Sequence, residues 1–459
     1  MIEYRSLKVA LLGAGSVGSN VAKLLLDHSD ELAARVGAGL ELIGIAVRDV
    51  DAPRRTDLPR ELFTTDARSL ILSADIVIEL MGGIDPAREY VLLALTSGAD
   101  VVTGNKALLA EHGPELFAAA EQVGAQLYYE AAVGGAIPII RPLRDSLAGD
   151  RVDRILGIVN GTTNFILDRM DTAGDTMEAA LEVATELGYA ERSDPAADIE
   201  GFDAAAKAAI LAGLAFHTTV PLESVHREGI TGITKQQVDA AREAGYVIKL
   251  LAICERVKGD DGADAGVSAR VYPALVPRQH PLGAVRGVHN AVFVQAAAAG
   301  DLMFYGAGAG GLQTASAVLG DVVSAARRHV VGGPGVAEST HADLPALEIG
   351  AVRTRYQITL LVADAPGVLA RIAALIAQNG VSVETVLQTA GSAPVASASA
   401  ASSSTPGLPA GGQGLPSATA TLVIGTHEAF ESALAATVEA LRDSEEVVAV
   451  TSVLRVEGA

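Results

Sequence analysis

The sequence predicts an α/β fold in three parts: a parallel sheet with crossover helices, an α+β middle part, and a C-terminal unit with a βαββαβ order. Three observations support this prediction. Over about the first 130 residues, short apolar runs alternate with helical patterns, as in parallel strands joined by helices. After Pro142 the rhythm changes, and near Arg355 a third alternation begins. The 459 residues are also enough for about three domains of roughly 150 residues each.

Composition excludes several classes of protein. The 34 basic and 55 acidic residues give a formal net charge of −21, which would repel nucleic acid and anionic membranes. A single cysteine excludes a disulfide framework and a multi-cysteine zinc site. The N-terminus lacks a signal-peptide pattern, and no apolar run reaches the roughly 18 residues of a membrane span. We therefore predict a cytoplasmic protein that binds neither nucleic acid nor membrane.

The first strand pattern, at residues 8–12, leads into a glycine-rich turn and a helical pattern over 17–26. Gly13, Gly15 and Gly18 form a G-x-G-x-x-G motif there. In this context the first glycine permits a tight turn, the second lets the backbone approach a pyrophosphate, and the third lets helix and strand pack closely. The alternative is an ordinary strand–helix turn. The context favours a dinucleotide-binding site.

The second strand pattern, at residues 40–47, is followed by charged residues of the kind that contact the ribose of a dinucleotide. An acidic residue at this place pairs with the 2′-hydroxyl of NAD, whereas an arginine pairs with the 2′-phosphate of NADP. Both types are present, as Arg48 and Asp49. Because Arg48 comes first, we favour NADP over NAD; the alternative is that Arg48 is an ordinary surface residue.

The next strand patterns end at the same edge of the predicted sheet, where ligands of such folds collect. Gly82 follows the run at 76–80, and Thr103 and Lys106 follow the run at 100–102. Lys106 is expected to anchor a ligand or donate a proton, the alternative being a cation at a helix start. The predicted cofactor-binding residues are Gly13, Gly15, Ser16, Val17, Gly18, Arg48, Gly82, Thr103, Lys106 and Gly308.

The middle part contains an acid-rich segment, with Glu191 and Asp198, that leads into an alanine-rich helix. In that helix Asp203 and Lys207 are spaced i, i+4 and share one face. The bland interpretation is a surface ion pair. However, residues 204–214 are otherwise almost wholly apolar, and burying an unpaired ammonium is costly. Several carboxylates beside one lysine suit a substrate ammonium and proton transfer.

A second polar segment of the middle part, Asn160–Asn164, precedes another helical pattern. Free backbone N–H groups at the helix start are expected to hold a substrate carboxylate, or the segment simply caps the helix; both can be true.

Other reactive residues receive no functional role. Cys254 follows an apolar run and is predicted to be a buried packing residue, which argues against a thiol-dependent aldehyde dehydrogenase. The histidines lack metal-ligand spacing. Lys249 and Arg328 are predicted to be solvated charges.

The C-terminal unit alternates strand and helix patterns in the order of a ferredoxin-like fold. The strands are predicted at 356–362, 381–387, 420–424 and 447–456, with helices at 368–378 and 429–441. Between the second and third strands lies a segment rich in Ala, Ser, Gly and Pro, residues 391–419. We predict that this segment is a flexible insertion, because it has no repeating apolar face.

Taken together, the motifs of the first 350 or so residues resemble those of homoserine dehydrogenase. Besides the glycine motif, the matching segments are Gly104–Lys106, Glu130–Pro138, Asn160–Asn164, Asp198–Lys207, Arg227–Ile230 and Tyr305–Gly310. The C-terminal unit resembles an ACT domain, through Asp364–Leu369 at its first strand–helix turn and Asn379–Val381 before its second strand.

The resemblance implies an NAD(P)H-dependent reduction of L-aspartate 4-semialdehyde to L-homoserine, a step in threonine, methionine and isoleucine biosynthesis. It also implies three domains. Residues 1–135, to which 306–330 return, would be the NAD(P)-binding Rossmann domain, 136–305 the catalytic and dimerisation domain, and 353–459 the ACT regulatory domain. The alternatives are a non-enzymatic amino-acid-sensing regulator and another Rossmann semialdehyde reductase.

Residue roles follow from the same resemblance. Lys207 matches the family's proton donor, and Lys106 a lysine that contacts cofactor and substrate. The implied substrate-binding residues are Glu191, Asp198, Asp203 and Thr162, the first two holding the substrate ammonium. A monovalent cation, usually sodium, is implied at Glu130 and the carbonyls of Val133, Gly135 and Ile137. The ACT unit implies regulation by an amino acid, for which we predict threonine, and a homodimer or homotetramer.

Overall fold

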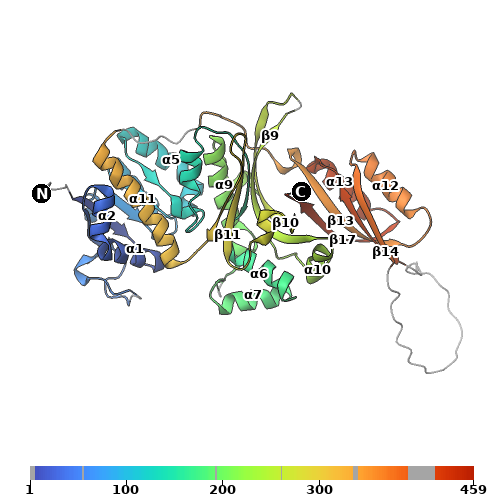
Figure 1. Cartoon of the computed structure of the whole chain (residues 1–459), viewed down its shortest axis with the longest axis horizontal. Coiled ribbons are helices and arrows are strands. Elements are labelled where there is room, and N and C mark those ends of the chain that lie inside the picture. The colour runs from blue at the N-terminus through green and yellow to red at the C-terminus, as the bar shows by residue number, and fades with distance from the viewer. Residues whose placement is uncertain are drawn as a thin grey trace, which may run out of the picture. The chain divides into compact units, whose positions relative to one another are not determined.

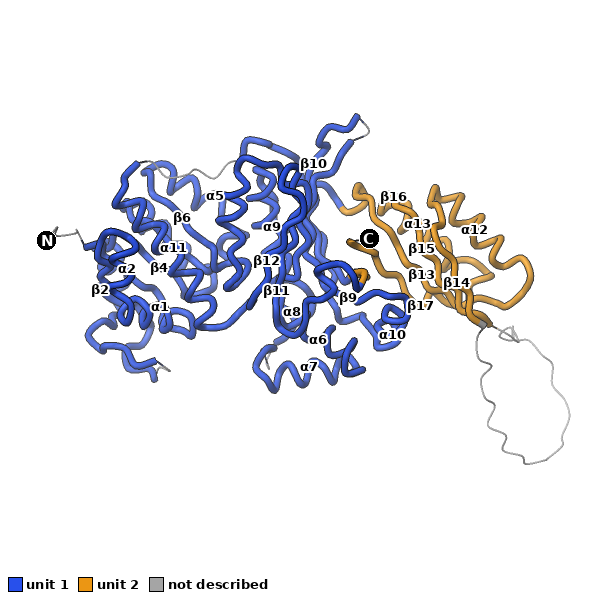
Figure 2. The backbone as a smooth tube through the Cα atoms, in the orientation of Figure 1, with its two compact units in different colours: residues 1–273, 278–348 blue, residues 274–277, 349–459 orange. Residues whose placement is uncertain are grey.

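The computed structural model describes residues 6–53, 56–191, 194–259, 261–333, 340–390 and 419–458. The chain forms two compact units (Figure 2). Unit 1 comprises residues 1–273 and 278–348, and unit 2 comprises 274–277 and 349–459. Within the described ranges, no helix is both long enough and apolar enough to cross a membrane.

A six-stranded parallel sheet forms the first part of unit 1. Its strands are β1 (Leu7–Leu12), β2 (Leu40–Ala46), β3 (Phe63–Thr64), β4 (Ile76–Glu79), β5 (Asp100–Thr103) and β6 (Leu127–Tyr128). The strand order β3-β2-β1-β4-β5-β6 is that of a Rossmann fold, in which the order reverses between β1 and β4. Every residue of β4 and β5 is buried, as expected for parallel strands covered on both faces. The predicted Rossmann-type fold is confirmed.

Helices cover this sheet, and one of them comes from far along the chain. They are α1 (Ser16–Asp27), α2 (Ser29–Val36), α3 (Ala67–Ile71), α4 (Ala87–Thr96), α5 (Lys106–Val123) and α11 (Gly311–Val331). In Figure 1, α11 lies alongside α1. Val318 and Val322 of α11 share one core with Leu11 and Val21. This packing places the segment just before α11, including Gly308, in unit 1 with the glycine turn.

The second part of unit 1 is a mixed sheet with helices packed against it. Its strands follow the order β12-β11-β7-β9-β10, with bounds Gly300–Ala307, His289–Ala296, Val152–Ile158, Tyr246–Lys258 and Asp264–Pro277. The helices are α6 (Gly161–Thr172), α7 (Met177–Glu186), α8 (Ala196–Ile199), α9 (Phe202–Phe216) and α10 (Lys235–Glu243), and β8 (His226–Arg227) pairs with β10. The alanine-rich α9 packs on β9, which is buried over most of its length.

Unit 2 is an antiparallel sheet with two helices. Its elements are β13 (Arg353–Ala363), α12 (Val368–Gln378), β14 (Val383–Ala390), β15 (Thr419–Thr426), β16 (Ala429–Phe430), α13 (Glu431–Arg442) and β17 (Val447–Val456). The strand order β17-β13-β15-β14 is ferredoxin-like, as predicted. Burial alternates along β13 and β15, so one face of this sheet carries the core. Apart from Thr419, the predicted insertion at 391–419 lies outside the described residues.

Short elements were harder to foresee than long ones. The sequence patterns missed α2, α3 and β12. β12 is an edge strand whose residues are exposed or only half-buried, so it lacks a clear apolar alternation. Helical turns of the 3-10 or π type occupy Arg60–Leu62, Glu130–Ala132, Pro142–Ser146, Leu222–Ser224, Pro281–Ala284 and Ile349–Ala351.

Two predictions about charged residues were wrong. Lys249 on β9 is fully buried rather than solvated, and its ammonium donates to Asn164 Oδ1 at 2.8 Å and to the Val285 carbonyl at 2.6 Å. Arg328 on α11 is not a free surface charge either, since it donates to the buried carboxylate of Asp100 at 3.1 Å. None of these three partners is near in sequence, which is why the local pattern could not reveal the contacts.

Candidate active site

The glycine turn between β1 and α1 has the geometry of a phosphate cradle. Gly13 has φ +98°, and a Cβ there would lie 2.7 Å from the Leu80 carbonyl oxygen. A Cβ on Gly18 would lie 2.1 Å from the Gly13 oxygen, so helix and turn approach closely only because both are glycines. Gly15 instead faces open space, since a Cβ there would have no neighbouring atom within 4 Å.

The start of α1 is left open for a ligand. Gly15 is the N-cap of the helix and supplies no side-chain cap, so the first backbone N–H groups, from Ser16 and Val17, lack a side-chain acceptor. A helix start of this kind attracts an anion, because its N–H groups and dipole both favour negative charge. The turn therefore fits the pyrophosphate of a dinucleotide.

A buried carboxylate organises the ends of β4 and β5. Glu79 accepts hydrogen bonds from Thr103 Oγ1 at 2.7 Å and from the Met81 N–H at 2.8 Å, with the Gly82 N–H at 3.4 Å. The hydroxyl of Thr103 in turn accepts from the Asn105 N–H at 3.0 Å. Glu79 received no role from the sequence, although a charged residue in the apolar run at 76–80 was a signal. It links Gly82 and Thr103, two of the predicted cofactor residues.

Arg48 lies just beyond β2, two residues after Ala46, and is exposed. It forms no ion pair with another described residue. The neighbouring carboxylate of Asp49 accepts from the Asp51 N–H at 2.9 Å. Arg48 is thus positioned at the carboxyl edge of the sheet, where the 2′ position of a bound dinucleotide is read in folds of this class.

Three charged side chains, predicted separately, meet at the start of α9. Asp203 is 7% exposed and forms ion pairs with both Lys106, the first residue of α5, and Lys207, one turn further along α9. The Lys207 ammonium lies 2.9 Å from Asp203 Oδ2 and donates to the Val159 carbonyl at 2.7 Å. Burial of Asp203 favours its protonated form, but the two ammonium groups outweigh this effect and hold its pKa well below the usual range.

Two further acids surround this ion pair. Asp198, on α8, and Asp203 both accept hydrogen bonds from the amide of Asn160, at 2.7 and 2.9 Å. Glu191 is exposed and follows α7 by a few residues. Glu191, Asp198, Asp203 and Lys106 all line one cavity of about 1290 Å³ between α5 and α9. The structure thus brings together four of the predicted residues, which lie up to 97 positions apart in the sequence.

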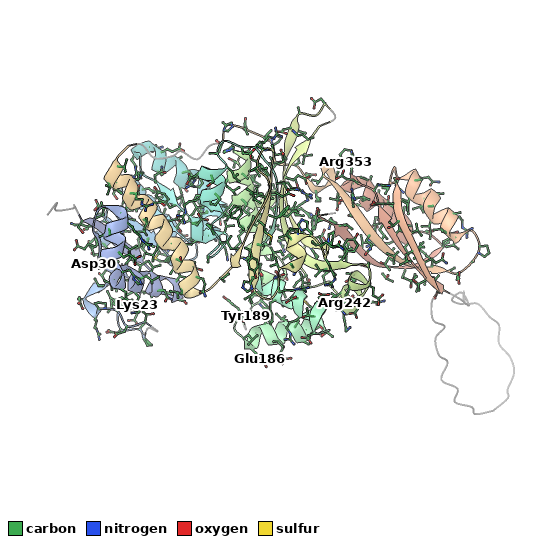
Figure 3. All side chains as sticks on the ribbon, viewed as in Figure 1. Lys23, Asp30, Glu186, Tyr189, Arg242 and Arg353 are labelled. Atoms are coloured by element: carbon green, nitrogen blue, oxygen red, sulfur yellow. The ribbon has the colours of Figure 1, made fainter. Side chains whose placement is uncertain are left out.

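Some predicted residues lie behind the cavity wall. Thr162 is buried, and its hydroxyl donates to the carbonyl of Tyr189 at 2.8 Å, which ties α6 to the segment after α7 where Tyr189 is labelled (Figure 3). Asn160 accepts from the Thr163 N–H at 2.9 Å, so the helix-capping interpretation of this segment holds. Lys207 is 8% exposed and does not itself line the cavity. Its ammonium pairs with Asp203, which does.

Glu130 lies at the start of the loop that links the two parts of unit 1. Its carboxylate accepts from the backbone N–H groups of Ile139, Ile140 and Arg141 at 2.6, 2.8 and 2.9 Å and from Arg141 Nε at 3.0 Å. Its own N–H donates to Asp321 of α11 at 2.8 Å. Burial and the nearby Glu130 charge raise the pKa of Asp321 to about 7. With this many donors, the Glu130 side chain anchors the loop.

The loop after Glu130 is tightly packed at two glycines, each of which lies close to a backbone carbonyl oxygen. A Cβ on Gly134 would lie 2.7 Å from the Ile137 oxygen, and one on Gly135, which has φ +62°, 2.2 Å from the Gly308 oxygen. Val133 and Ile137 are buried here. Among the described residues, no group of three or more His, Cys, Asp or Glu side chains is placed to hold a metal ion. A cation in this loop would therefore depend on backbone oxygens.

The single cysteine is a packing residue, as predicted. Cys254 is fully buried on β9, and its thiol lies 3.4 Å from the Ala208 carbonyl. Burial raises the pKa of this thiol to about 12. A thiolate nucleophile is thus excluded, and with it the thiol-dependent aldehyde dehydrogenase considered from the sequence.

Comparisons with known proteins agree with this geometry. Residues 13–130 match the family model described as "Homoserine dehydrogenase, NAD binding domain", and residues 138–323 match the model "Homoserine dehydrogenase". A homoserine dehydrogenase of Corynebacterium glutamicum is 50% identical over 451 residues, covering 98% of this chain and 95% of the relative.

Solved structures give the same picture. A homoserine dehydrogenase from Thiobacillus denitrificans matches with a TM-score of 0.85 and 35% identity, over 99% of each chain. A hyperthermophilic archaeal homoserine dehydrogenase in complex with NADPH matches with a TM-score of 0.59 and 28% identity, over 72% of this chain and 99% of that one.

Proposed function

The chain belongs to the homoserine dehydrogenase family, and we propose that Lys207, Asp203 and Lys106 form the centre at which it reduces L-aspartate 4-semialdehyde to L-homoserine. Family membership argues against the two alternatives, a non-enzymatic amino-acid sensor and another semialdehyde reductase. The observation that carries the proposed roles is the buried carboxylate of Asp203 between two ammonium groups at the wall of a large cavity.

A nicotinamide dinucleotide supplies the hydride when bound, and the residues of unit 1 fit such a group. The open helix start at Gly15, Ser16 and Val17 would hold the pyrophosphate, with Gly13 and Gly18 permitting the close turn. Gly82 and Thr103, joined through Glu79, would border the nicotinamide end, and Gly308 would border it from the segment before α11. Exposed Arg48 supports NADP over NAD, since its guanidinium suits a 2′-phosphate.

We assign the proton transfer to Lys207. When hydride reaches the aldehyde carbon, negative charge grows on the carbonyl oxygen, and a nearby ammonium stabilises this charge and delivers a proton. Two of the three N–H donors of Lys207 go to Val159 and Asp203, which leaves one for a substrate oxygen. Asp203, held ionised by its two lysine partners, pairs with the Lys207 ammonium and orients it. Lys106, the more exposed lysine, would orient cofactor and substrate.

The acids on the cavity wall suit the amino group of the substrate. Glu191 and Asp198 line the cavity with Asp203, and a substrate ammonium among them would gain charge-assisted hydrogen bonds. Thr162 supports this site indirectly, because its hydroxyl holds the Tyr189 carbonyl two residues before Glu191.

We extend the proposal to a monovalent cation, such as sodium, bound in the loop after Glu130. Glu130 fixes the loop, and the carbonyl oxygens of Val133, Gly135 and Ile137 would supply hard ligands for the ion. Such an ion would lie where the segments of the two parts of unit 1 meet, beside Gly308. Its expected contribution is to hold these segments in place.

The domain and regulatory assignments stay proposals. We assign residues 1–135 with 306–330 to cofactor binding, 136–305 to catalysis and dimerisation, and 353–459 to an ACT regulatory domain. The ferredoxin-like topology of unit 2 supports the last assignment. We propose threonine as the amino acid that regulates the enzyme, and a homodimer or homotetramer as the assembly. The cytoplasmic location predicted from the composition also stays a prediction.

One set of initial rates tests these proposals on the full chain. With L-aspartate 4-semialdehyde, the enzyme should oxidise NADPH faster than NADH at equal concentration, and oxidation should stop without the aldehyde. Added threonine should lower the rate, and replacing sodium by choline at constant ionic strength should lower it too. A rate that is unchanged by threonine over the millimolar range would refute the regulatory assignment, and one unchanged by choline would refute the cation.

A further inference from the structure

Asn160 has no role in the chemistry proposed above, and the family match gives it none. It lies two residues after the end of β7, serves as the N-cap of α6, and is 6% exposed. Its side-chain amide nitrogen donates to Asp198 Oδ1 at 2.7 Å and to Asp203 Oδ2 at 2.9 Å. One neutral group therefore bridges two carboxylates that come from different helices.

The orientation of this amide is fixed by its other end. Asn160 Oδ1 accepts from the Thr163 N–H at 2.9 Å and lies 3.1 Å from the Thr163 hydroxyl. The amide nitrogen thus donates twice and the amide oxygen accepts twice, which is the full hydrogen-bonding capacity of the group. Turning the amide over would aim its oxygen at both carboxylates and leave the helix start without its acceptor.

The residue before Asn160, Val159, binds the positively charged member of the same ion pair. The Val159 carbonyl accepts from the Lys207 ammonium at 2.7 Å. Two consecutive residues thus bind the Asp203–Lys207 pair. Val159 binds Lys207 through its backbone carbonyl, and Asn160 binds Asp203 through its side-chain amide. The charged groups that face this turn are Asp198 from α8, Asp203 and Lys207 from α9, and, beyond Asp203, Lys106 from α5.

The chemistry of the bridge explains the choice of asparagine. Two carboxylates that share one neighbour repel each other, and such pairs tend to take up a proton. An amide with two N–H donors stabilises both as anions without adding charge of its own. A cation at this place would instead compete with the substrate ammonium for Asp198, and a carboxylate would add to the repulsion.

We propose that Asn160 is a positioning residue for the reaction, whose amide bridges Asp198 and Asp203 and holds the two carboxylates at a fixed separation. Asp203 can then orient Lys207 while Asp198 stays available to the substrate ammonium. This inference rests on the proposed roles of Asp203 and Lys207, and it adds a residue that touches neither substrate nor cofactor.

Two substitutions separate positioning from helix capping. Asn160→Asp and Asn160→Ser both keep a side-chain oxygen that caps α6, because Asp and Ser are good N-caps, but both lose the two amide donors. We expect kcat with L-aspartate 4-semialdehyde to fall about tenfold in each variant, by the loss of orientation at the reacting groups. In Asn160→Asp the added charge should also move the acid limb of the kcat/KM profile upward by about one pH unit, which Asn160→Ser should not do.

Thr176→Ala is the matched control. Thr176 caps α7 through the Ala179 N–H, and neither residue lines the cavity, so this variant should lower Tm while leaving kcat and the pH profile unchanged. If both Asn160 variants match the wild type in kcat, KM and pH profile, Asn160 is only a cap and the inference is wrong. Lys207→Met, assayed in parallel, distinguishes this from failure of the proposed chemistry: a normal rate there overturns the role of Lys207 itself.

Discussion

Two buried lysines of unit 1, Lys207 and Lys249, can be compared directly because both donate hydrogen bonds to residues at the start of α6. Lys207 donates to the Val159 carbonyl just before that helix, and Lys249 donates to Asn164 within its first turn. They lie on neighbouring elements, since α9 packs on β9. The exposed fractions are 8% for Lys207 and 0% for Lys249.

Their surroundings nevertheless differ in two respects. Lys207 pairs directly with Asp203, which lines the cavity. Lys249 has two neutral oxygen acceptors, from Asn164 and Val285, and forms no ion pair within the described residues. Burial lowers its pKa to about 8, although the charges of Asp168 and Asp171 act in the opposite direction. Burial is thus common to both lysines, and the carboxylate partner at a cavity is what distinguishes Lys207.

The largest expected effect tests the chemical side of this comparison. Lys207→Met should lower kcat by about 10²–10⁴-fold, the usual range for losing a general acid, with little change in fold. Initial rates and far-UV circular dichroism would measure both. Lys235→Met is the control, because Lys235 forms an exposed i, i+4 pair with Asp239 on α10 and should leave the rate unchanged. Equal rates for Lys207→Met and the wild type would assign proton transfer elsewhere.

An intermediate effect is expected on stability at Lys249. Its folded-state pKa of about 8 lies below its ordinary 10.5, so between these values the unfolded chain binds more protons. The free energy of unfolding should therefore rise with pH over this window, by up to about 3 kcal/mol for this residue, and the whole cost should be present below pH 8. Denaturant unfolding of wild type and Lys249→Met at several pH values would measure the difference in slope.

The same variant also sharpens the contrast with Lys207. Lys249→Met should keep kcat at pH 7 within about threefold, because its partners are structural acceptors rather than cavity groups. A loss of kcat like that expected for Lys207→Met, in a protein of normal stability, would place Lys249 in the chemistry. Identical pH slopes of stability in wild type and variant would show that Lys249 is not titrating in this window.

The smallest effect is expected for Arg48, an exposed residue whose proposed role is to bind the 2′-phosphate of the cofactor. Arg48→Ala should raise KM for NADPH about tenfold, equivalent to about 1.4 kcal/mol, and leave KM for NADH and the Tm unchanged. Arg68→Ala, which removes an exposed ion pair with Glu89 on the same part of unit 1, should change neither KM. If both cofactors are affected alike in Arg48→Ala, the arginine does not read the 2′-phosphate.

The sequence predicted most of the fold because the relevant signals are local. The glycine motif lies between one strand and one helix, and the βαββαβ order of unit 2 follows from alternating patterns that match β13 and β15 closely. The edge strand β12 and the short α2 escaped prediction, since few of their residues are buried and periodicity is weak without burial.

Prediction of the site was less even. Asp203 and Lys207 were found from their spacing on one helix, an interaction that a chain sets by itself. The bridging roles of Glu79 and Asn160 were not assigned, because the contacts through which these residues link separate elements span 24 to 43 residues. The family resemblance supplied the roles of Glu191 and Asp198, which spacing alone had left open.

By itself, then, the sequence determined the three-part α/β organisation, the dinucleotide turn and the buried acid–lysine pair, since each depends on contacts within one or two adjacent elements. Only the tertiary structure decided which lysine pairs with a cavity-lining carboxylate and which is fully buried against neutral acceptors. Lys207 and Lys249 both stand in apolar segments. Their difference arises because Lys106 and Asp198 are brought close to Asp203 from α5 and α8, whereas the Lys249 ammonium donates to neutral oxygens of α6 and of the segment before β11.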